Sequence, residues 1–258
     1  METRKTARFK FIKELRGLNP SLPIDVLERY KTYNSDIESY ERSLSGVLKG
    51  RTFEGLLRDR NEPIRAIDLM STTEALASLF QKLPDKDKKG LAVGLSDMRV
   101  YDKRMNKEKR DADLNIDFLG TKYGGNATKG LMGDISSGAT WDAIDDWLEG
   151  EKADLIIERA EGGLITLPHT DLFYKTMLQR VWDRLKSDGG MFIGQSFADQ
   201  AYKTYDIDLL GWVDRATQQG IDLMYEEKMV PWSAGQKMIL AGALRMTKHP
   251  DSPMMLPV

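Results

Sequence analysis

The sequence contains no cysteine and only two histidines, and these scarcities remove whole classes of site. Without cysteine there is no disulfide, no thiolate nucleophile, no zinc–cysteine site and no cysteine-ligated iron–sulfur cluster. Neither His169 nor His249 stands in a cluster of potential ligands. We therefore expect no metal site and no catalytic triad built on histidine.

Long apolar runs and a large charge of one sign are also missing. No apolar run approaches the roughly 20 residues that cross a bilayer. The basic N-terminus, Met1–Arg8, is not followed by the apolar core of a secretory signal. We expect a cytoplasmic protein with no membrane partner. The formal net charge is −2, so charge does not indicate nucleic acid as a partner.

The 258 residues divide into three predicted parts. Residues 1–62 show apolar side chains at helical spacing and no convincing strand, which predicts an N-terminal helical extension. This extension could act as a cap or lid over a site, or it could be a structural element packed on the edge of a sheet. Residues 63–248 are predicted to form an α/β domain, and residues 249–258 a C-terminal tail.

Within the α/β part, short apolar runs alternate with amphipathic segments. Residues 85–90 are predicted as a charged turn, residues 98–113 as a charged insert and residues 120–130 as a glycine-rich loop. Strands are predicted at 64–70, 91–95, 131–135, 154–158 and 190–196, and helices at 72–83, 140–148, 170–186 and 209–216.

The last two predicted strands, 221–226 and 236–247, break this alternation. Only a loop, residues 227–235, connects them, and a parallel crossover needs about a dozen residues or more. These two strands should therefore be antiparallel neighbours. The sequence predicts the α/β fold class: a doubly wound, mostly parallel seven-stranded sheet with a terminal antiparallel strand pair, plus the helical extension.

This order of elements resembles the class I S-adenosylmethionine-dependent methyltransferases, which have a Rossmann-like fold, over roughly residues 63–247. The segment 185–190 reads Leu-Lys-Ser-Asp-Gly-Gly, similar to the Leu-Lys-Pro-Gly-Gly turn of that family. A nicotinamide-dependent oxidoreductase is disfavoured, because the chain lacks Gly-x-Gly-x-x-Gly and a sixth parallel strand. The resemblance implies S-adenosylmethionine as the cofactor and a methyl acceptor that the sequence does not identify.

The resemblance places the family's first strand and the glycine-rich cofactor loop that follows it at residues 66–74. It implies that Asp68, Met70, Ser71 and Thr72 contact the cofactor. The family has glycines here that let the backbone approach the methionine part of the cofactor, whereas this chain carries Met70, Thr72 and Glu74 near those positions. Asp68 has a structural alternative, because an aspartate in this place can cap the helix that follows.

The ends of the next two strands supply the other implied contacts. Asp97 stands where the family has an acidic residue that bonds the ribose hydroxyls, and Asp134 with Ile135 stands where the family contacts the adenine amino group. Asp97 and Asp134 could instead be ordinary turn residues at the ends of strands.

Two glutamates follow the fourth predicted strand and are the candidate catalytic residues. Glu158 and Glu161 lie in the sequence Glu-Arg-Ala-Glu-Gly-Gly, where the family has an Asn/Asp-Pro-Pro-Tyr motif for amino-group methylation. A carboxylate there could act as a general base or orient an acceptor. Alternatively, Arg159 could form an internal salt bridge with either glutamate.

Two functions remain open from the sequence. The first is a methyltransferase that binds S-adenosylmethionine as a small-molecule cofactor and methylates an unidentified acceptor. Alignment supplies much of the catalysis in methyl transfer, so few catalytic side chains are obligatory. The second is a non-catalytic binding or scaffold protein that keeps the fold but has lost cofactor binding, as Met70, Thr72 and Glu74 suggest.

Overall fold

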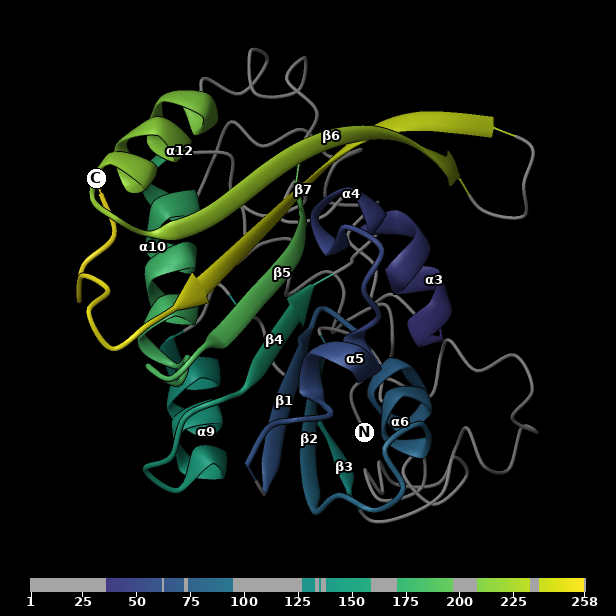
Figure 1. The fold of residues 1–258 in the computed structure, drawn as a ribbon. Coiled ribbons are helices and arrows are strands. Elements are labelled where there is room, and N and C mark those ends of the chain that lie inside the picture. Colours follow the sequence, from purple (N-terminus) through teal and green to yellow (C-terminus); the bar gives the residue numbers. More distant parts are fainter. Residues whose placement is uncertain are drawn as a thin grey trace, which may run out of the picture.

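A mixed β-sheet forms the centre of the molecule (Figure 1). The computed structural model describes residues 36–61, 63–71, 74–94, 127–132, 135, 138–158, 171–196, 208–232 and 237–257. In these ranges the sheet has seven strands in the order β3-β2-β1-β4-β5-β7-β6. Their bounds are β1 Ile64–Leu69, β2 Lys88–Gly94, β3 Thr128–Met132, β4 Leu155–Glu158, β5 Gly190–Ser196, β6 Asp222–Trp232 and β7 Lys237–Lys248.

The direction of the strands confirms the predicted sheet. Strands β1 to β5 pair in parallel with their neighbours. Strand β7 is antiparallel to both β5 and β6, so the sheet ends in the expected antiparallel pair. Parallel strands need long crossovers, and helices supply them here.

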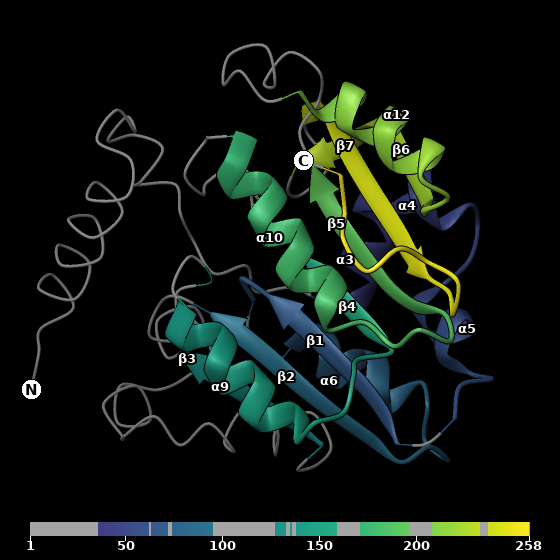
Figure 2. The same ribbon diagram turned by 90° about the vertical axis from the view of Figure 1, so that its left-hand side faces the viewer.

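Helices cover both faces of the sheet, which makes the fold doubly wound (Figures 1 and 2). On one face lie α9, α10 and α12, and on the other lie α3 to α6. No described helix combines the length and the apolar character needed to cross a membrane. The helix bounds are α3 Ile37–Ser43, α4 Ser45–Leu48, α5 Phe53–Leu57, α6 Glu74–Gln81, α9 Gly138–Leu148, α10 Asp171–Asp183 and α12 Leu209–Gln218.

The two central strands explain this layering. Strands β1 and β4 read as nearly continuous apolar runs, as strands buried on both faces do. Ala66 and Ile157 belong to the core on the α3–α6 side, whereas Ile67 and Ile156 belong to the core on the opposite side. All four are fully buried. Because successive side chains of a strand point to opposite faces, each strand contributes to both cores.

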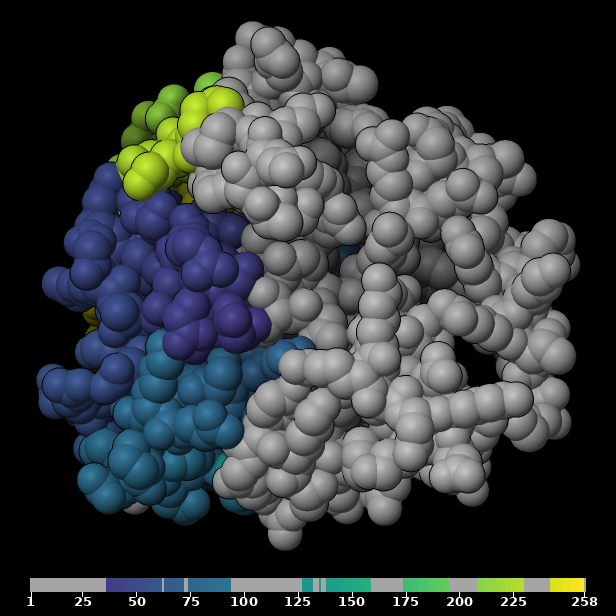
Figure 3. Space-filling view, turned by 90° about the vertical axis from the view of Figure 1, so that its right-hand side faces the viewer, coloured from purple at the N-terminus to yellow at the C-terminus, as the bar shows by residue number. Residues whose placement is uncertain are grey.

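The described part of the N-terminal helical extension lies on one face of this sheet (Figure 3). Asp36 caps α3 by accepting from the Ser39 N–H at 2.8 Å, and Thr52 caps α5 by accepting from the Gly55 N–H at 3.1 Å. The buried faces of these short helices contact the same core as Ile64 and Leu155. The extension therefore packs on the face beside α6, and residue 62 as a domain boundary stays a prediction.

Three predicted loops contain strand residues. Strand β2 begins at Lys88, inside the predicted turn 85–90, because this residue pairs with Ile64 at the start of β1. Strand β3 begins at Thr128, inside the predicted loop 120–130, and ends at Met132. Strand β6 continues to Trp232 through most of the predicted loop 227–235. It includes Pro231, which an edge strand tolerates because one side of its backbone needs no partner.

The C-terminal tail is fixed to the helices α10 and α12. The indole N–H of Trp182 donates to the Pro253 carbonyl at 2.9 Å, and that of Trp212 donates to the Pro257 carbonyl at 2.8 Å. Between these contacts, Leu256 is only 6% exposed and belongs to the core. Buried indole N–H groups need acceptors, and the tail supplies them.

Replacing Leu256 tests whether the tail is part of the core. We expect Leu256→Ala to lower the free energy of unfolding by about 2–4 kcal/mol, because it leaves a cavity beside the helices. Met254 is 85% exposed, so Met254→Ala should change the free energy of unfolding by less than about 0.5 kcal/mol. Urea unfolding of both variants measures the difference. Equal, small effects would show that the tail contributes nothing to stability.

Candidate functional site

The polar residues expected at the site gather where β1 and β4 end. The two strands are parallel neighbours, with Asp68 beside Ile157 and Leu69 beside Glu158. Ligands of open α/β sheets bind at the carboxyl ends of the strands. Asp68 and Glu158 are both completely buried at this edge, so the fold brings a predicted cofactor residue and a predicted catalytic residue to adjacent strands.

Tyr40 of α3 completes a buried polar cluster at the end of β1. Its hydroxyl donates to Asp68, 3.0 Å from Oδ2 and 3.2 Å from Oδ1, and lies 2.8 Å from the Ser71 Oγ. All three residues are fully buried. Among the described residues, the partners of the Asp68 carboxyl are thus the side chains of Tyr40 and Ser71 rather than the start of α6.

Burial controls the protonation of this cluster. Loss of water raises the pKa of Asp68 well above its ordinary value of 3.8, and the hydrogen bonds from Ser71 and Tyr40 only partly oppose the rise. Burial also raises the pKa of Tyr40 well above 10.0, helped by the nearby charges of Asp68 and Glu158. The surroundings of this cluster therefore favour the neutral forms of both side chains.

The chain turns sharply after β1, at the predicted cofactor loop. Met70 has a φ of 61°, in the left-handed region that favours glycine. Its side chain is 1% exposed and belongs to the core on the α9–α10 side. The next residue, Ser71, donates its N–H to the Val93 carbonyl at 3.1 Å, which ties the turn to β2. The backbone thus has a conformation typical of glycine, in the segment where the sequence resemblance led us to expect glycines.

Ile135 has a structural role in the described molecule. It is 1% exposed, and its carbonyl accepts from the Trp141 indole N–H at 2.7 Å, which fixes the residue against α9. Four other predicted site residues, Thr72, Asp97, Asp134 and Glu161, lie outside the described residues. Arg159, the alternative partner of the two glutamates, also lies outside them.

No pattern in the sequence assigns Tyr40 to the site, because it lies on a helix that precedes the predicted α/β part. A tyrosine at a helical core position gives no sign of the group that its hydroxyl meets. In the described ranges, no group of three or more histidine, aspartate or glutamate side chains has the arrangement of a metal site.

Substitutions at Met70 test whether the left-handed turn is the position of a missing glycine. Met70→Ala should destabilise the protein by about 2–5 kcal/mol through a core cavity. Met70→Gly should be more stable than Met70→Ala by about 1 kcal/mol, because glycine has no penalty for the left-handed conformation. Chemical denaturation of both variants gives the order.

Ile67 of β1 is the control, since it is fully buried in an extended strand. There the order should reverse, with glycine less stable than alanine by about 0.5–1 kcal/mol. If glycine were the less stable variant at both positions, the backbone at Met70 would not be under left-handed strain.

The protonation of Asp68 predicts an unusual pH dependence. Between 3.8 and the raised folded-state pKa, the folded protein holds a proton that the unfolded chain has released. Stability therefore falls as the pH rises through this interval, by up to about 1.4 kcal/mol per pH unit. Asp68→Asn cannot titrate, so its stability relative to the natural protein should increase with pH. Urea unfolding from about pH 3 to about pH 8 measures this slope.

Asp208 provides a control of opposite sign. Its carboxylate bonds to Arg215 at 3.0 Å and caps α12, and the bond to Arg215 lowers its pKa. The stabilisation by Asp208 is present above 3.8 and is lost as the pH falls toward the lowered pKa. The stability of Asp208→Asn relative to the natural protein should therefore decrease as the pH rises through this acidic range. Slopes of the same sign for both variants would contradict a protonated Asp68.

Comparison with solved structures returns methyltransferases, as the sequence resemblance implied. A structure from Klebsiella pneumoniae, whose activity is inferred to be O-methyl transfer, is 14% identical and aligns over 95% of this chain and 99% of its own, with a TM-score of 0.45. The N-methyltransferase NodS from Bradyrhizobium japonicum, in complex with S-adenosylhomocysteine, is 13% identical over 82% and 97% of the two chains, with a TM-score of 0.44. TrmN from Thermus thermophilus is 15% identical over 74% of this chain and 46% of its own, with a TM-score of 0.42.

Neither a model of a protein family nor a curated protein sequence matches the chain. Because the sequence identities are this low, these likenesses concern the fold only. The activity has to be inferred from the residues of this chain. The chain's own strand directions are those that the resemblance predicted: a parallel series followed by an antiparallel pair. The molecule has the arrangement of the class I methyltransferase fold.

Proposed function

We propose that the protein is an S-adenosylmethionine-dependent methyltransferase acting on an unidentified acceptor. The observation that carries this proposal is the turn after β1. Met70 has a left-handed backbone directly after the buried Asp68, at the carboxyl edge of a doubly wound sheet. The fold supports the same proposal through its terminal antiparallel pair. Because the Met70 side chain is buried in the core on the α9–α10 side, the backbone of this turn is the part that would approach the ligand.

In this proposal the chain divides binding and reaction between strand ends. The loop from Asp68 to Thr72 would hold the methionine part of the cofactor, Asp97 its ribose, and Asp134 with Ile135 its adenine. Bound S-adenosylmethionine would supply an electrophilic methyl group. The protein's main task is to hold the acceptor in line with that group, because alignment alone lowers the barrier substantially.

Glu158 and Glu161 are the proposed groups on the acceptor side. Glu158 ends β4 between Leu69 of β1 and Gly194 of β5, so it lies centrally on the carboxyl edge. A buried carboxylate in this place could accept a proton from the acceptor or orient it by a hydrogen bond. Glu161 follows three residues later, outside the described residues.

A non-catalytic scaffold protein remains the second candidate, and a specific observation favours it. Asp68 and Ser71 are completely buried and are joined to Tyr40, so their side chains already have partners within the protein. If the polar side chains of a cofactor loop are hydrogen-bonded within the protein interior, fewer of them are available to bind a ligand. Glu74 at the start of α6 adds a negative charge where the family has glycine.

Calorimetry separates the two candidates. The full chain should release or absorb heat with S-adenosylmethionine and S-adenosylhomocysteine, with saturation at a stoichiometry near one, and each ligand should raise the melting temperature. S-adenosylhomocysteine that copurifies with the protein would be found by mass spectrometry. No heat and no thermal shift with millimolar ligand would rule out the methyltransferase and leave the scaffold.

Asp97→Ala tests the ribose assignment in the same titration. Loss of a hydrogen bond to a charged group costs about 1.5–3 kcal/mol, so the dissociation constant should rise about ten- to one-hundred-fold. Asp251→Ala removes the same charge from an exposed residue of the tail and should leave the affinity unchanged. Binding with equal affinity to all three proteins would refute the role of Asp97 while leaving the cofactor in place.

A further inference from the structure

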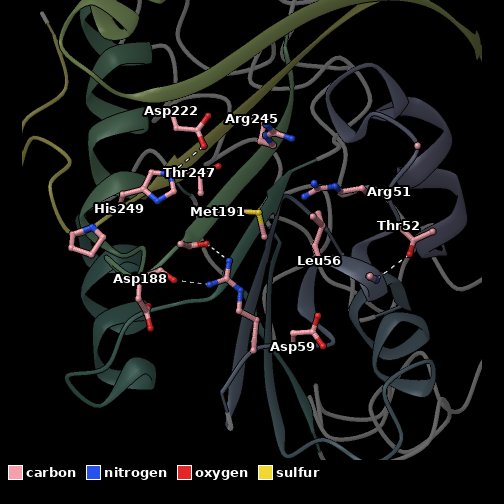
Figure 4. Close-up of a pocket in the computed structure, with 15 residues that line it drawn as sticks. Arg51, Thr52, Leu56, Asp59, Asp188, Met191, Asp222, Arg245, Thr247 and His249 are labelled. Atoms are coloured by element: carbon pink, nitrogen blue, oxygen red, sulfur yellow. Dashed lines mark hydrogen bonds and ion pairs between the residues drawn. The ribbon is translucent and has the colours of Figure 1, made fainter.

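A cavity lies near the start of β5, at the edge of the sheet opposite to the one where β1 and β4 end with Asp68 and Glu158. Figure 4 shows the side chains that line it. Its volume is about 1040 Å³, and its walls come from the α4–α5 connection, the turn before β5, and the adjoining ends of β6 and β7. Met191 lines it near the start of β5, whereas Glu158 pairs with Gly194 further along that strand. The cavity is thus separate from the proposed methyl-transfer site.

Two of the arginines that line this cavity form no ion pair within the described ranges. Arg51 is exposed on the α4–α5 connection, and its side chain points into the cavity (Figure 4). Its guanidinium forms no ion pair with any residue in the described ranges. Arg245 of β7 reaches in from the sheet and donates to the Val47 carbonyl at 3.2 Å, again without an ion pair among the described residues. Guanidinium groups without carboxylate partners are suited to bind an anion.

A third arginine makes the wall of the cavity rigid. The Nη1 of Arg60 donates to the Asp188 carbonyl at 2.7 Å, and its Nη2 donates to the Gly189 carbonyl. Gly189 has a φ of 97°, and a Cβ there would lie 2.8 Å from the Arg60 Nη1. The turn before β5 therefore needs glycine to accept Arg60. A preformed wall reduces the ordering that a ligand must cause on binding.

Side chains of both charges line the cavity: the arginines are Arg51, Arg60 and Arg245, and the aspartates are Asp59, Asp188 and Asp222. In Figure 4, Arg51 and Arg245 lie on one side of the apolar side chains of Leu56 and Met191. The carboxylates of Asp59 and Asp188 lie on the other side (Figure 4). Asp222 also lines the cavity, but it contacts His249 at 3.2 Å. The complementary ligand has an anionic group at one end and hydrogen-bond donors at the other.

We infer that this cavity binds a phosphorylated small molecule of sugar-phosphate or nucleotide size. Its phosphate is held by Arg51 and Arg245, because guanidinium groups match phosphate oxygens in charge and geometry. Its hydroxyl or amino groups donate to Asp59 and Asp188. Its body lies against Leu56 and Met191. Binding here is independent of the cofactor site and therefore goes beyond methyl transfer.

Calorimetry with ribose 5-phosphate, inorganic phosphate and ribose tests this site in the full chain. Ribose 5-phosphate should bind saturably and at least about ten-fold more tightly than ribose, because the phosphate makes the charged contacts. Its affinity should fall as salt is added. Inorganic phosphate should bind more weakly than ribose 5-phosphate. Equal affinity for ribose and ribose 5-phosphate, or no binding, would overturn the proposal.

Arginine-to-glutamine variants locate the phosphate. Arg51→Gln and Arg245→Gln should each weaken ribose 5-phosphate binding about ten-fold or more. Arg58→Gln is the matched control: Arg58 is 66% exposed and pairs with Glu54, and it does not line the cavity. The affinity of Arg58→Gln for ribose 5-phosphate should stay within about two-fold of the affinity of the natural protein. Circular dichroism checks that each variant folds. If Arg245→Gln does not fold, Arg51→Gln still tests the proposal, because Arg51 is exposed and its replacement should not disturb the fold.

A competition experiment distinguishes this site from the cofactor site. Saturating S-adenosylhomocysteine should leave ribose 5-phosphate binding unchanged, and Asp97→Ala should bind it normally. Displacement by S-adenosylhomocysteine would place the phosphate in the cofactor site and overturn the inference. If no S-adenosylmethionine binds at all while ribose 5-phosphate still binds through Arg51, the proposed methyltransferase function fails and this site stands.

Discussion

The burial of β1 and β4 on both faces is the constraint on which the rest of the structure depends. Neither strand has a polar face to give to solvent, so each face of the sheet must be covered by helices. On one side α9 and α10 return the chain between parallel strands and also cover it. On the other side α6 covers the sheet near β1 and β2, while α3 and α4 lie nearer β6 and β7. Residues 36–61 of the N-terminal segment are therefore used to complete the core.

The energetics agree with this role of the extension. Seven apolar side chains from α3, α4, α5 and the joint at residue 44 are almost fully buried: Ile37, Tyr40, Leu44, Val47, Leu48, Phe53 and Leu57. Burial of one such side chain contributes about 1.5–3 kcal/mol. Together they are comparable with the net stability of a whole domain, about 5–15 kcal/mol. Residues 36–61 of the extension are therefore part of the interior of the described molecule.

Much of the sheet could be predicted from the sequence, because apolar runs and glycine turns follow from local rules. The fifth strand, residues 190–196, has the same bounds in the structure. The antiparallel end followed from the short connection between its strands. The starts of β2 and β3 could not be predicted, since Lys88 and Thr128 join strands through backbone pairing with neighbours and not through apolar side chains.

The candidate site was predictable only in part, for a similar reason. Asp68 and Glu158 could be placed because strand ends meet at one edge of a parallel sheet. Tyr40 could not, since it precedes Asp68 by 28 residues on a separate helix and looks like an ordinary core residue. Its contact links the helical extension to the loop after β1, so the predicted cofactor loop is shaped by a segment outside the predicted α/β part.

The fixed tail has a consequence for the order in which the protein can be completed during synthesis. Chains fold as they are made, with the N-terminal parts first. Trp182 and Trp212 are almost fully buried, yet their acceptors are the carbonyls of Pro253 and Pro257. Until the ribosome has released these prolines, both indoles lack their final partners and Leu256 has not closed the core. The core beside α10 and α12 therefore cannot be completed before the tail has been synthesised.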